Sequence, residues 1–152
     1  MLRVKRKTNV VSRRFFIGLL ASTMVTFSCV TLAETSKAPE GAKVYFVTPQ
    51  NGDTVTSPVK IVFGLSGMGV APAGVVKHNT GHHHLLIDLK ELPDVSQSLP
   101  STDQVKHFGG GQTETMLTLE PGTHTLQLLL GDHIHKPHDK PVLSEKITIT
   151  VK

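Results

Sequence analysis

The chain has 152 residues, of which 38% are hydrophobic, 5% aromatic and 18% charged, and its formal net charge at pH 7 is +4. This length favours one compact domain and excludes a large multidomain enzyme. Six of the sixteen Lys and Arg residues lie within the first 33 residues, which contain no acid. The rest of the chain carries ten Lys and twelve acids, a net charge of −2, and no arginine. Because arginine makes the bidentate contacts to phosphate and guanine, we expect neither a nucleic acid nor a nucleotide as a partner.

The N-terminal segment has the pattern of an export signal. Basic residues precede an apolar run at 15–30, and small residues stand three and one positions before a cleavage site after Ala33. The run is short compared with the roughly 20 apolar residues that span a bilayer. We therefore predict a signal peptide at 1–33 and release into the periplasm, followed by a linker at 34–41 and a single domain at 42–152.

Two features of the signal leave alternatives open. Arg13 and Arg14 before Phe15 resemble the twin-arginine export motif, and an ordinary secretory signal that contains two arginines is the other interpretation. Cys29, the single cysteine, is lost on cleavage after Ala33, which excludes a disulfide and a blue-copper centre in the product. Membrane contact is expected only if the signal stays uncleaved or Cys29 is lipidated.

Short apolar runs separated by proline and glycine predict an all-β fold in the rest of the chain. In the last run Ile147, Ile149 and Val151 alternate with polar residues, as in a strand with one buried face. We predict an immunoglobulin-like β-sandwich of about seven strands. The predicted strands lie at 42–48, 58–65, 83–89, 113–119, 122–130 and 143–152, with a weaker one at 95–99.

All nine histidines follow residue 77, and seven of them lie in two windows, 78–84 and 133–138. In an immunoglobulin-like sandwich the loops that contain these windows gather at one end, and His107 approaches from a third loop of that end. His124 is expected at the opposite end. Residues two positions apart on a strand share a face, so His82 and His84 form a natural pair of ligands. The 133–138 window repeats this spacing.

This convergence predicts a transition-metal site. The predicted ligands are His82, His84, His133, His135, His138 and His107. Imidazole-rich sites without thiolate favour divalent copper, zinc or nickel, and we expect copper or zinc first. Asp88, Asp132 and Asp139 are near enough in sequence to be ligands or to accept a ring N–H.

Two other classes of function stay open. One is a non-catalytic interaction module whose histidine-rich loops contact a periplasmic protein partner in a pH-dependent manner. The other is an enzyme with a histidine-bound metal, although we expect no catalytic residues. The segment 64–68 lacks the final glycine of a nucleophile elbow, and the glycines at 109–111 lack the partners of a phosphate-binding loop.

Four segments carry a family resemblance. They are GHHHLLID at 81–88, HFGGGQTE at 107–114, PGTHTLQL at 121–128 and GDHIHKPH at 131–138. Together they resemble a family of small exported bacterial domains of unknown function, over about 42–152. The resemblance implies export and the extent of the domain, and it implies no activity.

Overall fold

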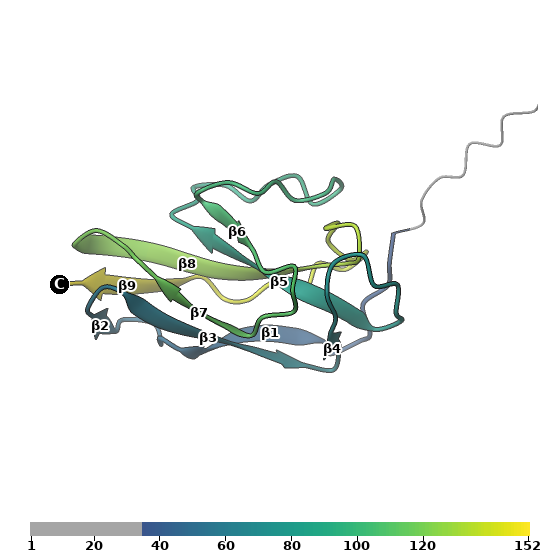
Figure 1. Ribbon diagram of the computed structural model, residues 1–152, viewed down its shortest axis with the longest axis horizontal. Helices are drawn as coiled ribbons and strands as arrows, with labels where there is room; N and C mark the ends of the chain where they lie inside the picture. The colour runs from purple at the N-terminus through teal and green to yellow at the C-terminus, as the bar shows by residue number, and fades with distance from the viewer. Residues whose placement is uncertain (1–34) are drawn as a thin grey trace, which may run out of the picture. The chain divides into compact units, whose positions relative to one another are not determined.

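The computed structural model describes residues 35–152. These residues form β-strands and no helix. The predicted signal peptide lies outside the described residues. Two sheets face each other, so the prediction of an all-β sandwich is confirmed (Figure 1). Residues 35–152 include no helix long and apolar enough to cross a membrane.

The strands are distributed over two sheets. The first sheet has the antiparallel order β1-β3-β7, with bounds β1 (Lys43–Thr48), β3 (Val59–Ser66) and β7 (Glu114–Leu117). The second has the order β2-β9-β8-β5-β4, with bounds β2 (Thr54–Val55), β9 (Ile147–Val151), β8 (Gly122–Gly131), β5 (Thr80–Ile87) and β4 (Gly69–Val70). A short strand, β6 (Val105–His107), pairs antiparallel with β5.

The main core lies between the two sheets. In β9, Ile147, Ile149 and Val151 are buried and the two threonines between them are exposed, as the alternation predicts. The opposite sheet contributes Phe46, Ile61 and Phe63, among others, to the same apolar cluster. Burial of this apolar area supplies the main favourable term for folding of a domain without disulfides.

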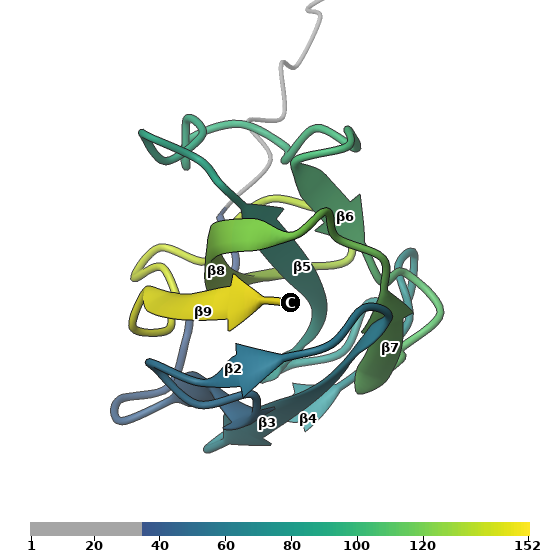
Figure 2. The ribbon, with the colours of Figure 1, turned by 90° about the vertical axis from the view of Figure 1, so that its left-hand side faces the viewer.

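Strand β5 and the second half of β8, from Leu126 onward, are buried on both faces, which an ordinary two-layer sandwich does not require. A second, smaller apolar cluster covers their outer face and includes Leu86, Leu99, Val105 and Leu129. In Figures 1 and 2, β6 and the segment 88–104 lie over this sheet on the side away from β1 and β3. A third layer therefore shields the outer face of β5 from water.

The weaker strand predicted at 95–99 is not formed. Asp94 Oδ1 accepts hydrogen bonds from the backbone N–H and the hydroxyl of Ser96, and this local pairing forms a turn there instead. The immunoglobulin-like assignment of the topology stays a prediction. The strands that carry or precede the two histidine windows are neighbours, because β5 pairs with β8 and His82 stands opposite Gly131.

Candidate metal centre

Strand β5 supplies two of four imidazole rings that gather on its outer face. Successive side chains of a strand point to opposite faces. The rings of His82 and His84 lie 4.8 Å apart, whereas the ring of His83 lies 5.0 Å from that of Phe63 in the main core. His82 and His84 are 0% and 1% exposed. The alternation of β5 thus presents two buried imidazoles on the covered face.

Strand β6 supplies the third ring. Its pairing places His107 opposite His84, and the Nε2 atom of His107 lies 3.1 Å from the Nε2 atom of His82. A Cβ atom at Gly109 would overlap the ring of His107. A glycine at this position therefore lets the chain return over the ring.

The loop after β8 supplies the fourth ring. His135 has a φ of +68°, a left-handed conformation that is uncommon for a residue with a side chain. Its ring stacks on that of His107, with centroids 4.5 Å apart and an interplanar angle of 26°, and lies 5.1 Å from that of His82. One ring nitrogen each from His82, His107 and His135 lies within 4.8 Å of the others, so this triad could hold a metal ion.

The spacing of the nitrogens suits coordination. Two nitrogens bound to one tetrahedral ion at about 2.0–2.1 Å stand about 3.3–3.4 Å apart. The Nε2 atoms of His82 and His107, at 3.1 Å, are already near that separation. A modest movement of His135, which belongs to a loop, would complete a three-nitrogen site.

His84 lies beside this triad and is enclosed by protein. Its ring is 4.8 Å from that of His82 and 5.1 Å from that of His107, and neither of its nitrogens has a hydrogen-bond partner. A Cβ atom at Gly131 would come within 2.7 Å of the Cε1 atom of His84. A buried nitrogen without a partner costs about 1–3 kcal/mol, a cost that a metal bond would remove.

Burial and mutual proximity favour the neutral forms of His82, His84 and His107. Burial is the main cause that lowers the pKa of His82 to about 4, and the neighbouring His107 and His135 lower it further. Burial likewise lowers the pKa of His84 to about 3 and shifts the pKa of His107 downward. The carboxylate of Asp132 opposes the shift at His82 and would attract a cation. Neutral imidazole is the form that binds metal ions, so at neutral pH these three rings need no deprotonation.

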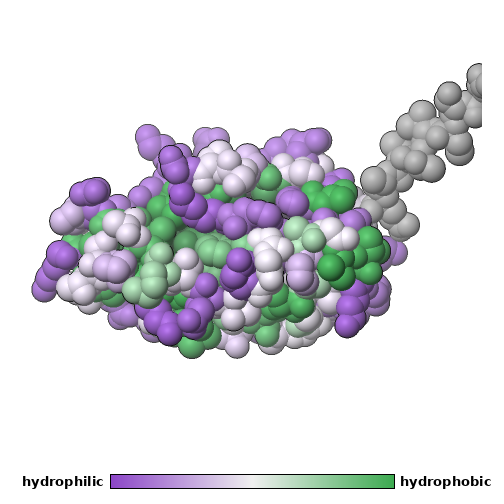
Figure 3. Space-filling model, viewed as in Figure 1, coloured by the Kyte–Doolittle hydropathy of each residue, from purple (hydrophilic) through white to green (hydrophobic). Residues whose placement is uncertain are grey.

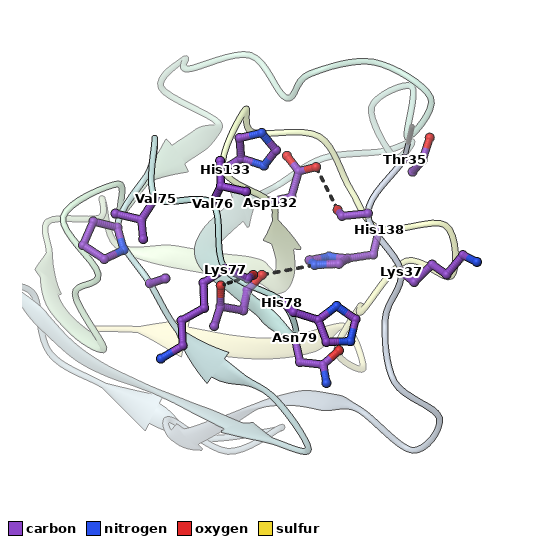
Figure 4. Close-up of a pocket in the computed structure, with 15 residues that line it drawn as sticks. Thr35, Lys37, Val75, Val76, Lys77, His78, Asn79, Asp132, His133 and His138 are labelled. Atoms are coloured by element: carbon purple, nitrogen blue, oxygen red, sulfur yellow. Dashed lines mark hydrogen bonds between the residues drawn. The ribbon is translucent and has the colours of Figure 1, made fainter. Parts of the chain in front are cut away.

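The predicted ligand set is divided between two places. His82, His84, His107 and His135 come together, while His133 and His138 line a different cavity of about 400 Å³ together with His78 (Figure 4). There the Nε2 atom of His138 lies 3.3 Å from the Thr80 carbonyl oxygen.

The three aspartates lie in hydrogen-bond networks. Asp88 pairs with His124, whose Nδ1 atom is 2.7 Å from the carboxylate, and His124 also approaches the Glu120 carbonyl. Asp132 accepts a hydrogen bond from Ser36, and Asp139 accepts one from the backbone of Ala38. These contacts oppose a role as direct ligands in this conformation.

The end of the domain where β4 lies exposes apolar side chains (Figure 3). The loop after β4 contributes Val75 and Val76, which are 45% and 78% exposed and line the cavity that holds His133.

Two glycines of the site, Gly109 and Gly131, were not predicted from the sequence as part of it. Gly109 lies two positions after the histidine whose ring it accommodates, whereas Gly131 accommodates His84, which is distant in the sequence and gives no local signal.

The fold and the site together define a small all-β sandwich domain with a triad of imidazoles, one buried and two partly buried, that could hold a metal ion. Residues 61–152 match the family described as "Domain of unknown function (DUF4399)", and the chain belongs to this family. The resemblance drawn from the sequence is thereby confirmed, and the four clustered histidines all fall within the match. No curated protein and no solved structure matches the chain.

Proposed function

We propose that this protein is exported to the periplasm and binds a transition-metal ion, copper or zinc, for storage or delivery. The observation that carries the proposal is the cluster on the covered face of β5. The ring nitrogens of His82, His107 and His135 lie within 4.8 Å of one another. The neighbouring ring of His84 has two buried nitrogens without partners.

Ligand chemistry supports copper or zinc over calcium or magnesium. The site offers imidazole nitrogens, and hard cations prefer oxygen ligands. The carboxylate of Asp132, which acts on the pKa of His82, already accepts hydrogen bonds at both of its oxygens. A delivery or storage role fits a site whose ligands come from separate elements, because movement of the loop that carries His135 would open it.

The pKa values weigh against a pH-sensing role for the cluster. A histidine sensor works between about pH 5 and 8, near its ordinary pKa. The pKa values of about 4 for His82 and about 3 for His84 lie below that range, so these rings stay neutral across it. This favours metal binding over the pH-dependent interaction module at this site.

The test is a titration of the exported protein, produced from the full chain without a tag and stripped of metal by a chelator. Cu²⁺ and Zn²⁺ are added separately and heat is measured. We expect saturation near one equivalent, and His135→Ala is expected to weaken binding at least about tenfold because it removes one ligand. His78→Ala is the matched control, because His78 is exposed and lies in the other cavity.

Two results would contradict the proposal. One is no saturable binding of either ion, which would leave the interaction module as the better function. The other is equal loss in both variants, which would place any binding outside the cluster. For Cu²⁺, electron paramagnetic resonance should show several coordinated nitrogens in the wild type and fewer in His135→Ala.

Export is tested separately by cell fractionation and by mass spectrometry of the mature N-terminus. We expect periplasmic protein that begins at Glu34. Replacing Arg13 and Arg14 by Lys should block export by the twin-arginine route and leave an ordinary secretory signal active. Cytoplasmic protein of full length would contradict the export proposal and leave the metal proposal to its own test.

A further inference from the structure

The first described residues, 35–39, are attached to the loop that carries His135. The Ser36 hydroxyl donates to Asp132 Oδ2 at 2.8 Å, across 96 positions of the chain. The Asp139 N–H donates to the Ser36 carbonyl at 2.9 Å, and the Ala38 N–H donates to Asp139 Oδ1 at 3.0 Å. We call residues 35–39 the N-terminal strap. Three hydrogen bonds therefore tie the strap to both ends of residues 132–139, the loop that carries His135, which we call the site loop.

Asp132 organises the loop at its other carboxylate oxygen. Asp132 Oδ1 accepts hydrogen bonds from the N–H groups of Ile134 and Lys136, both at 3.0 Å. Asp132 also exchanges backbone hydrogen bonds with Lys136 and His135, at 2.8 and 2.9 Å. This closed turn holds His135 at its φ of +68°. A left-handed conformation is unfavourable for a non-glycine residue and persists only where its surroundings hold it.

The two oxygens of Asp132 thus have separate partners. One belongs to the backbone of the loop and the other to Ser36. Asp132 is only 3% exposed, and a buried carboxylate is stable only when its oxygens are hydrogen-bonded. Without the Ser36 hydroxyl, Oδ2 loses this hydrogen bond, and the carboxylate is held on one side only in the orientation in which Oδ1 accepts from the amides of Ile134 and Lys136.

We infer that Ser36 is a positioning residue of the metal centre, which holds His135 in place through Asp132. This inference rests on the proposed function, because His135 matters here as a ligand. It assigns a role to a segment outside the family match, which begins at residue 61. By linkage, a metal ion held by His135 must in turn stabilise the attachment of the strap.

The experiment compares zinc affinity in three variants of the exported protein. Ser36→Ala removes the hydroxyl, Ser36→Thr keeps it, and Ser57→Ala is the matched control. The Ser57 hydroxyl accepts a hydrogen bond from the Leu119 N–H at 3.1 Å, also over a long sequence separation, outside the site loop. We expect Ser36→Ala to weaken zinc binding about tenfold, in the range for lost outer partners of metal ligands, and the other two variants to bind like wild type.

Two further measurements separate positioning from a general structural role. In a His135→Ala background, Ser36→Ala should cause no additional loss of affinity, because its effect passes through His135. Hydrogen exchange without metal should show faster exchange of the Ile134 and Lys136 amides in Ser36→Ala. In wild type, zinc should slow exchange of the Ala38 and Asp139 amides.

The outcomes are distinguishable. If wild type binds neither Zn²⁺ nor Cu²⁺, the proposed function fails and this inference fails with it. If wild type binds zinc and Ser36→Ala binds equally well, only the inference is overturned. It is also overturned if Ser36→Ala leaves the exchange of the Ile134 and Lys136 amides unchanged, or if its loss of affinity is undiminished in the His135→Ala background.

Discussion

Replacing His83 by Leu should stabilise the protein and reduce the pH dependence of its stability. His83 is 0% exposed, lies against Phe63, and has no hydrogen-bond partner at either ring nitrogen. Each buried polar atom without a partner costs about 1–3 kcal/mol. A leucine of similar volume removes that cost, and imperfect packing returns less than about 1.5 kcal/mol. Two such atoms cost about 2–6 kcal/mol, so after the packing loss we expect a net gain of roughly 0.5–6 kcal/mol at neutral pH.

The pH dependence follows from the protonation of His83. Burial is the main cause that lowers the pKa of His83 from an ordinary value of 6.5 to about 4, and the backbone of Gln112 opposes this shift. Between these values the unfolded chain binds a proton that the folded protein does not bind. Stability is therefore intact above the unfolded pKa and falls as the pH decreases toward about 4, by roughly 3 kcal/mol in total for this residue. His83→Leu removes this contribution.

The assay is urea denaturation followed by far-ultraviolet circular dichroism, with a chelator present, at several pH values between about 7 and 4. His82 and His84 contribute in both proteins and largely cancel in the difference between wild type and His83→Leu, because His83 is the smallest of the causes that shift the pKa of His82. That difference should grow by about 1.4 kcal/mol per pH unit below the unfolded pKa. A variant that is less stable at neutral pH, or a difference that does not change with pH, would refute the reasoning. Zinc binding should be unchanged.

Two other predictions concern the space beside His84 and the far end of the sheet. Gly131→Ala should destabilise the protein by about 1–3 kcal/mol and weaken zinc binding, because its Cβ meets the enclosed ring of His84 at 2.7 Å. Gly69→Ala is the control, because its Cβ meets only a methyl group at 3.5 Å. Gly69→Ala should change neither the stability measured by urea denaturation nor the zinc affinity measured by titration. The hydrogen bond to Asp88 raises the pKa of His124, so this pair stabilises the fold below the unfolded pKa and loses its effect as the pH rises through the folded value. His124→Ala should therefore cost more stability near pH 6 than near pH 9, and an equal cost at both would contradict the ionic contribution.

The strand residues of the site could be predicted from sequence because a strand has a fixed period. His82 and His84 share a face for that reason alone, and the structure places their rings 4.8 Å apart. The same spacing at His133 and His135 has no such meaning, because these residues lie in a turn and His135 has a φ of +68°. A left-handed residue breaks the alternation, so the two side chains go to different places.

The neighbourhood of His107 depends on tertiary pairing that no local pattern encodes. Strand β6 has only three residues, too few for a periodic signal, and it forms because β5 offers it an edge. The sequence placed His107 in a loop at one end of the sandwich. Its contact with His82 follows instead from the register that sets it opposite His84.

The covering layer explains why these histidines differ from solvent-exposed ones. A sandwich of two sheets would leave His82 and His84 on a wet surface, where imidazoles keep an ordinary pKa and hydrogen-bond to water. Here β6 and the segment 88–104 bury that face through Leu99 and Val105, and burial is the leading cause of the low pKa of both rings. The stability that these apolar contacts provide therefore maintains buried, neutral imidazoles in which His82 Nδ1 and both nitrogens of His84 have no hydrogen-bond partner, a state from which metal binding gains.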